Sequence, residues 1–247
     1  ATVKTDVPGV SSTTVYPFSY IDDSALTRTS NFVLVEDVTL TGITAEIVTG
    51  VFRGIFDGAG HTLNVSATIS KSDTGVLFGE VTGNGAIRNL KYVAEVNQTV
   101  DYVGGLALWI TTATVENVYA EVKFTGTGTN ASVFRTLNYW DSPSIIKNVI
   151  TNVTTSADST YSVYTSKNAN VSGAIFTPVV AIIASDSTVT NSTGATSVLT
   201  KAAALTQTSS WTNNYSGCWD WATVLSLANT IIVTDPTTST LGMYIST

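Results

Sequence analysis

The residues best suited to chemistry lie in the segment "GIFDGAGHTLNV", residues 54–65, which holds the single histidine, His61, and an aspartate four residues before it, Asp57. A carboxylate beside an imidazole could act as an acid–base pair. The same spacing is typical of a tight turn between two strands, because Gly58 and Gly60 tolerate positive φ. We expect the turn, formed by Asp57, Gly58, Gly60 and His61, with His61 hydrogen-bonded across it.

Carboxylates elsewhere in the chain are scattered. Polysaccharide hydrolysis needs two or three carboxylates that converge on the substrate, and a calcium-dependent lyase needs a cluster of them. The adjacent acidic pairs are Asp22–Asp23 and Glu36–Asp37, and neighbours in a strand point to opposite faces. With one histidine and one cysteine, Cys218, no His- or Cys-based metal site is expected. We therefore expect no catalytic residue, no metal and no cofactor. Stacked strands could still bring isolated aspartates together, so a polysaccharide lyase or hydrolase stays as an alternative.

The composition indicates strands whose outer faces are polar but uncharged. Asp, Glu, Lys and Arg make up 12% of the 247 residues, about half the usual share, and Thr, Ser and Asn supply the missing polarity. β-Branched Thr suits a pleated surface. The net charge of −7, with Lys and Arg scattered singly, argues against nucleic-acid partners. No apolar run approaches the roughly 20 residues of a membrane-spanning helix, so membrane insertion is not expected.

An asparagine followed or preceded by apolar residues recurs along the chain, and the intervals of 25, 28, 31, 22 and 21 residues match one coil of a β-solenoid. The positions are Asn64, Asn89, Asn117, Asn148, Asn170 and Asn191. A short apolar run precedes each of the first four, as in "VFRGIF", "GVLFGEV", "GGLALWI" and "SVFRTL". Each coil therefore reads as a strand, a tight turn and a second strand that carries asparagine at a corner.

The physical role of these asparagines would be a ladder. Equivalent residues of successive parallel coils stack about 4.8 Å apart, so one asparagine side chain can donate to the carbonyl of the next. Asparagine also tolerates the left-handed conformation that suits a bend. We predict an all-β fold, a single-stranded right-handed parallel β-helix (β-solenoid) with capped ends and roughly six to eight coils. All six asparagines are expected in the ladder.

The segment "FRGIFDGAGHTLNV", followed by "GVLFGEVTGNGAIRNLKYVAEV" and "VGGLALWITTATVENVYAEVKF", resembles the GLUG-motif class of right-handed parallel β-helix proteins. The likeness covers about residues 31–149 and includes "FVLVEDVTLTG" as a lead-in strand. Members of this class include bacterial surface proteins, adhesin-like regions and phage-associated proteins. The resemblance implies a fold and a surface role, without a defined activity.

Both ends of the solenoid must be capped, because terminal coils expose strand edges and core. Residues 1–31 are expected to form a lead and cap, residues 32–200 the coils, and residues 201–247 a tryptophan-rich cap with a last edge strand, all in one structural domain. Four aromatic residues lie close together in the last segment: Trp211, Tyr215, Trp219 and Trp221. They read as a hydrophobic plug for the last coil or as a platform for sugars or a partner.

The function expected from these features is that of a non-enzymatic extracellular or virion-surface protein, located outside the cell, on its surface or on a virion. It would serve as a fibre, a decoration or a host- or glycan-binding adhesion module. The alternative is a carbohydrate-active enzyme or carbohydrate-binding module of the pectate-lyase-like β-helix class. The candidate partners are a second and third copy in a homo-oligomer such as a trimer, other surface or virion proteins, and a glycan.

Overall fold

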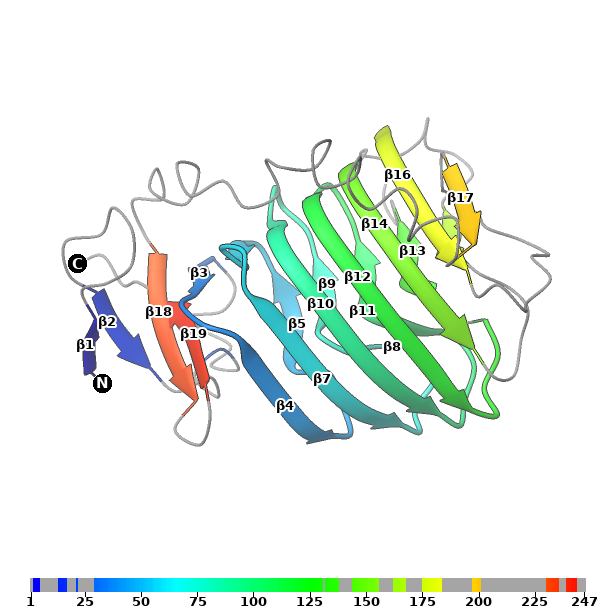
Figure 1. Ribbon diagram of the computed structural model, residues 1–247, viewed down its shortest axis with the longest axis horizontal. Coiled ribbons are helices and arrows are strands. Elements are labelled where there is room, and N and C mark those ends of the chain that lie inside the picture. The colour runs from blue at the N-terminus through cyan, green and yellow to red at the C-terminus, as the bar shows by residue number, and fades with distance from the viewer. Residues whose placement is uncertain are drawn as a thin grey trace.

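The computed structural model of the chain describes residues 2–4, 13–16, 21, 29–130, 132–137, 144–155, 162–167, 175–183, 197–200, 230–235 and 239–243. Parallel stacked strands wind most of these residues into a β-solenoid of about four turns (Figure 1). The predicted fold class is confirmed, with fewer turns than expected. Within the described residues, no helix is long and apolar enough to cross a membrane.

The first solenoid sheet has eight strands in the order β17–β16–β14–β12–β10–β7–β4, with β6 paired to β10. Its strands are β4 (Val38–Ile43), β6 (Ile55–Asp57), β7 (Thr62–Ile69), β10 (Ala86–Gln98), β12 (Thr114–Gly126), β14 (Ile145–Thr155), β16 (Ile175–Ile183) and β17 (Ser197–Thr200). All neighbours in it are parallel. This sheet presents the broad row of long strands in Figure 1.

The second solenoid sheet has six strands in the order β15–β13–β11–β9–β5, with β8 paired to β11. Its strands are β5 (Val48–Phe52), β8 (Thr74–Gly75), β9 (Phe78–Val81), β11 (Val103–Ile110), β13 (Ser132–Leu137) and β15 (Ser162–Lys167). The chain alternates between the two sheets, so each coil adds one layer to both. In β7 every second residue is buried and the residues between are partly or fully exposed, which leaves one polar face outside.

Aromatic side chains fill the space between the two sheets. The rings of Phe52 and Phe78 stack with centroids 5.1 Å apart, and Phe56 meets Phe78 edge-on at 5.5 Å. Tyr92 is fully buried and its hydroxyl donates to the carbonyl oxygen of Gly105 at 2.7 Å. Burial raises the pKa of the Tyr92 hydroxyl. The Tyr92 hydroxyl therefore has a hydrogen-bond partner inside the core.

A third, five-stranded sheet lies at the N-terminal end, in the order β1–β2–β18–β19–β3. Its strands are β1 (Thr2–Lys4), β2 (Thr13–Tyr16), β3 (Asn31–Leu34), β18 (Thr230–Asp235) and β19 (Ser239–Met243). Because β18 and β19 both pair with β3, the C-terminal strands lie beside the first coil in Figure 1. The two strands described within the predicted C-terminal cap segment therefore pair at the N-terminal end of the solenoid. An apolar strand sequence shows that an edge will be paired, but it carries no information about which edge.

The predicted lead-in strand over residues 32–42 is divided between two sheets. β3 belongs to the sheet at the N-terminal end and β4 to the first solenoid sheet, with a bend at residues 35–37 between them. Asn31 Oδ1 accepts a hydrogen bond from the backbone N–H of Ile55 at 3.0 Å. This contact joins β3 to β6 and thus the end sheet to the first coil.

Candidate functional site

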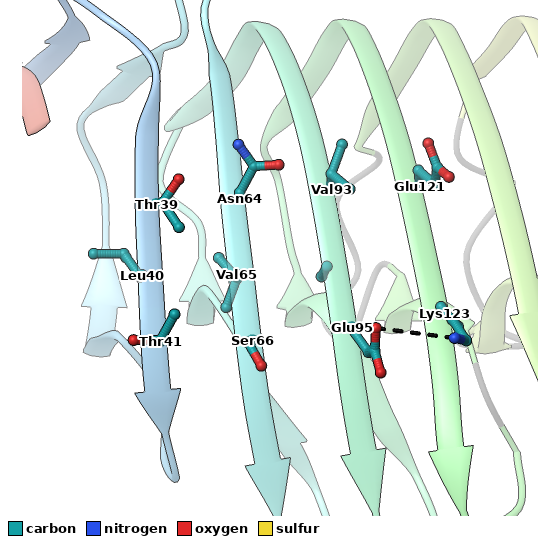
Figure 2. Close-up of a pocket in the computed structure, with 11 residues that line it drawn as sticks. Thr39, Leu40, Thr41, Asn64, Val65, Ser66, Val93, Glu95, Glu121 and Lys123 are labelled. Carbon is teal, nitrogen blue, oxygen red and sulfur yellow. Dashed lines mark ion pairs between the residues drawn. The ribbon is translucent and has the colours of Figure 1, made fainter. Parts of the chain in front are cut away.

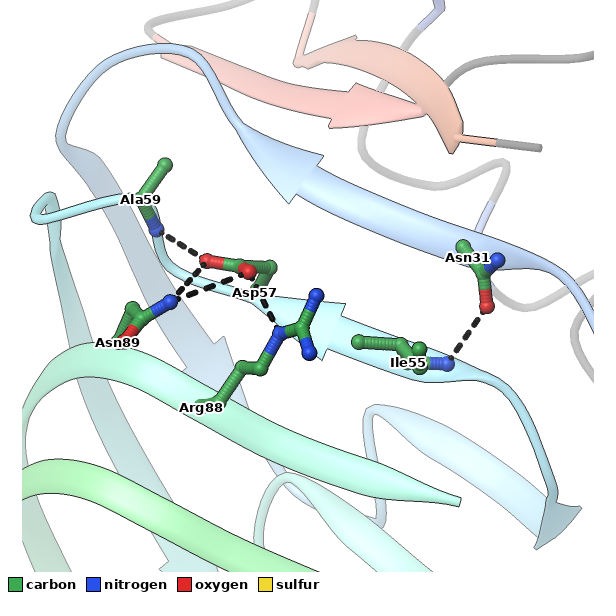
Figure 3. Close-up of polar contacts among 6 residues, drawn as sticks. All are labelled: Asn31, Ile55, Asp57, Ala59, Arg88 and Asn89. Carbon is green, nitrogen blue, oxygen red and sulfur yellow. Dashed lines mark hydrogen bonds and ion pairs between the residues drawn. The ribbon is translucent and has the colours of Figure 1, made fainter. Parts of the chain in front are cut away.

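Asp57, which ends β6, lies in a buried polar corner and has no exposed surface. Its Oδ2 accepts a hydrogen bond from Arg88 Nε at 2.8 Å, and its Oδ1 accepts one from the N–H of Ala59 at 2.8 Å. Asn89 Nδ2 lies 3.3 and 3.2 Å from the two carboxylate oxygens (Figure 3). These donors come from the turn after β6 and from the next coil, so Asp57 ties two coils together.

Burial dominates the electrostatics of Asp57. Desolvation raises the pKa of its carboxyl, and the hydrogen bond from Ala59 and the charge of Arg88 oppose that rise. The Arg88 side chain is itself only 11% exposed. A buried carboxylate and guanidinium that satisfy each other are out of reach of a substrate, so this corner is structural.

The segment after Asp57 is a turn. The backbone N–H of His61 donates to the carbonyl of Gly58 at 2.8 Å, and Ala59 and Gly60 have φ of 50° and 84°. Two central residues with positive φ are typical of a type I′ turn. Gly58 serves a different purpose from the one we expected, because a Cβ there would lie 2.5 Å from the backbone oxygen of Asn89. The lack of a side chain at Gly58 lets the next coil approach.

The side chain of His61 lies beside a different aspartate from the one in its own segment. Its Nδ1 is 3.5 Å from Oδ1 of Asp37, which precedes β4. Asp37 is 70% exposed and also accepts a hydrogen bond from the N–H of Thr62 at 2.8 Å. Since Asp57 faces Arg88, the structure does not bring Asp57 and His61 together as an acid–base pair.

Three of the six predicted ladder positions share one level of the solenoid. The registers of β10 with β12 and of β12 with β14 place Asn89, Asn117 and Asn148 at equivalent points of successive coils. Asn89 is 1% exposed and has a φ of 53°, so it supplies the left-handed corner that divides β10 into two legs. The Asn89 side chain donates to Asp57, and hydrogen bonds between asparagine side chains stay a prediction.

Asn64 does not belong to this level, and its predicted place in the ladder is wrong. It pairs with Val93 of β10 and Thr39 of β4, on the outer face. The residue level with Asn89 in the preceding coil is Gly58, as the pairing of β6 with β10 shows. The first coil makes its corner with a glycine turn. Its asparagine, Asn64, therefore lies several residues after the corner instead of at it.

The remaining predicted positions fall outside the described residues. These are the ladder asparagines Asn170 and Asn191 and the aromatic cluster of Trp211, Tyr215, Trp219 and Trp221. The plug and the sugar platform expected there stay predictions.

The outward face of the first solenoid sheet carries a groove of about 260 Å³ that crosses β4, β7, β10 and β12 (Figure 2). Two rows of side chains border it. The upper row in Figure 2 is Thr39, Asn64, Val93 and Glu121, and the lower row is Thr41, Ser66, Glu95 and Lys123. We call this surface the strand-face groove. It exists because parallel register places every second residue of successive coils in line.

The charged residues of the strand-face groove lie at its β10–β12 end. Glu95 Oε2 is 3.9 Å from Lys123 Nζ, and both side chains are 60% exposed. The hydroxyl of Tyr119 donates to Glu121 Oε2 at 3.2 Å, and Lys91 Nζ lies 6.0 Å from the centre of the Tyr119 ring. The polar groups of the β4–β7 end are uncharged hydroxyls and an amide, from Thr39, Thr41, Asn64 and Ser66.

Sequence reasoning passed over these groove residues, although a signal for them was present. The coils that follow Asn89 and Asn117 alternate buried and exposed residues, and the repeat places Glu95 level with Lys123. With the register fixed at the asparagine, the exposed positions of neighbouring coils could have been aligned in the same way. That alignment would have brought Glu95 and Glu121 to one face.

Comparison of the chain with protein-family models, with curated proteins and with solved structures finds no match. Among the described residues, no group of three or more His, Cys, Asp or Glu side chains could hold a metal ion. The function of the strand-face groove must therefore be inferred from the chemistry of its side chains. It can offer hydrogen bonds in two parallel rows to an extended ligand.

Proposed function

We propose that this protein is a non-enzymatic structural or adhesion module of an extracellular or virion surface, and that it binds a glycan in the strand-face groove. The observation that carries the proposal is the in-register double row of exposed and half-buried side chains across four strands, all of them polar except Val93. A solenoid holds such rows on a rigid sheet, so little side-chain and backbone freedom is lost when a ligand binds.

The chemistry of the rows suits sugar hydroxyls. Thr39, Thr41 and Ser66 are exposed hydroxyls, Asn64 is a half-buried amide, and Glu95 is an exposed acceptor. Hydroxyls and amides both donate and accept hydrogen bonds. The half-exposed Val93 adds an apolar contact at the centre of the groove. A surface with this mixture can pair the hydroxyls of a sugar and cover one of its apolar faces.

A carbohydrate-active enzyme is the second candidate, because Glu95 and Glu121 share one groove on adjacent strands. Glycosidases use two carboxylates, one of which acts as an acid in apolar surroundings. Glu95 instead lies in solvent beside Lys123, and Glu121 accepts a hydrogen bond from Tyr119. This arrangement favours binding over cleavage.

The surface role is supported by the resemblance to GLUG-motif proteins and by the solenoid fold. A solenoid of this kind would act as a homo-oligomer, with a trimer as the simplest fibre, or would attach to other surface or virion proteins. Electron microscopy of the native virion or cell surface tests the surface role. Failure to find the protein on either surface would contradict that role.

One experiment separates the two candidates. The purified chain is applied to a glycan array and incubated with the polysaccharides that bind, and soluble products are measured. We expect binding without release of oligosaccharides. Release that is lost in Glu121→Gln but retained in Asp73→Asn, an exposed carboxylate outside the groove, would establish the enzyme instead.

A further inference from the structure

We infer that the ligand of the strand-face groove is an uncharged polysaccharide chain that lies across the strands, parallel to the solenoid axis. This inference rests on the proposed function and specifies its substrate class. Its basis is the distribution of charge and hydrogen-bonding groups along the groove.

The charge of the groove disfavours polyanions. Glu95 and Glu121 contribute two negative charges and Lys123 one positive charge, which leaves the lining at −1. Adding Lys91, which lies beside Tyr119, brings the sum only to zero. The whole chain carries −7. A uronate or sulfated polymer would need a surplus of Lys or Arg to offset its own charges, and this groove has none.

Positively charged chains are disfavoured by the neutral end. Between β4 and β7 the groove offers Thr39, Thr41, Asn64 and Ser66, none of which is charged. A polycation would therefore find no counter-charge over half of its contact length. Hydroxyl groups are the ligand chemistry that both halves can pair, because Glu95 accepts and Lys123 donates hydrogen bonds to neighbouring hydroxyls of one sugar.

The geometry of the rows sets the direction of the chain. From β4 to β12 there are three strand steps, which span about 14 Å, and the two rows are separated by about 7 Å along the strands. The groove is therefore longer across the strands than along them. A linear chain that follows it contacts each coil once, so affinity should rise with the number of sugar units until the four strands are covered.

The test compares soluble neutral glucans, mannans and xylans with polyuronates, by isothermal titration at low and high salt. We expect neutral oligosaccharides to bind with an affinity that grows with length and changes little with salt. Ser66→Ala removes one hydrogen bond and Glu95→Gln removes the charge that strengthens one, so each should weaken binding by about tenfold. Thr49→Ala, an exposed position on the second sheet, and Asp73→Asn are the matched controls and should leave it unchanged.

Each other outcome of the titrations would contradict a specific part of the proposal. Binding only to polyuronates, with an affinity that falls steeply as salt rises, would overturn the neutral ligand and leave the glycan-binding role intact. Neutral binding that is unaffected by Ser66→Ala and Glu95→Gln would overturn the placement in the groove. Binding to neither class would overturn the proposed function itself.

Discussion

Two carboxylate–cation pairs in this solenoid, at Asp57 and at Glu95, show how register separates structural from accessible chemistry. Asp57 and Arg88 lie 2.8 Å apart with 0% and 11% of their side chains exposed. Glu95 and Lys123 lie 3.9 Å apart with 60% of each exposed. Both pairs join neighbouring coils of the same sheet. The buried pair stabilises the stack, whereas the exposed pair is available to a ligand.

The difference arises from the position of each pair relative to the corner. Asp57 and Arg88 lie on the short leg just before the corner at Asn89, where turn and strand enclose the side chains. Glu95 and Lys123 lie on the long leg after it, at positions that alternate outward. Substitutions at the two sites should therefore separate stability from binding.

The largest effect is expected for Asp57→Ala. Removal of the carboxylate leaves Arg88 buried without its partner, which should lower the free energy of unfolding by about 3–5 kcal/mol. Urea denaturation followed by circular dichroism measures the change. Asp57→Asn keeps an acceptor for the N–H of Ala59, so its free energy of unfolding should lie between those of the wild-type protein and Asp57→Ala. A loss below about 1 kcal/mol, the value typical of a surface pair, would show that the corner is not structural.

Asn89→Ala should destabilise by about 1–3 kcal/mol, because it removes a buried donor to Asp57 and places a side chain that disfavours φ > 0 at the corner. Asn89→Gly keeps the left-handed conformation and loses only the hydrogen bond, so it should cost less. The pair is compared in the same denaturation assay. Equal losses for both variants would mean that the conformation at this corner contributes nothing.

Glu95→Gln breaks the exposed pair and should change the free energy of unfolding by less than about 1 kcal/mol, while glycan affinity falls about tenfold. Thermal denaturation and titration on one preparation give both values. A stability loss equal to that of Asp57→Ala would remove the distinction between the two pairs.

The smallest effect concerns Glu46, which is half-buried before β5. Desolvation raises the pKa of its carboxyl, opposed by the N–H of Gly75 and the charge of Lys71. A raised pKa in the folded state means that this group favours folding below its unfolded pKa and that this contribution is lost as the pH rises. Glu46→Gln, which mimics the protonated form, should therefore raise the melting temperature at pH 7, with the gain vanishing below about pH 4.5. A gain that is independent of pH would show that the titration of Glu46 has no part in it.

Much of the fold could be predicted from the periodicity of the sequence. The spacing of the asparagines and of the apolar runs before them predicted a parallel β-solenoid, and the corner at Asn89 has the left-handed conformation that made asparagine a good candidate. The prediction that Asn64 lies at the corner of the first coil was wrong, because that coil turns at Gly58 and has no asparagine there. The pairing of β18 and β19 with β3 had no local signal, since it depends on contacts between distant segments.

The site was harder to predict than the fold. Asp57 and His61 attracted attention because they are close in sequence and reactive in type, yet their partners are Arg88 and Asp37 from neighbouring coils. No motif in the sequence marks the groove residue Glu95. It can be recognised as part of a site only once the structure places it beside Lys123. Side chains that meet across coils lie about one repeat apart, so their meeting depends on a register that single residues do not reveal.

A crystal structure of the protein with a neutral oligosaccharide tests the central claim most directly. The sugar chain should lie across β4, β7, β10 and β12, between the row that begins at Thr39 and the row that ends at Lys123, with its glycosidic bonds intact. A chain bound at another surface, or found cleaved in the groove, would contradict the account of this face as a non-catalytic glycan-binding surface.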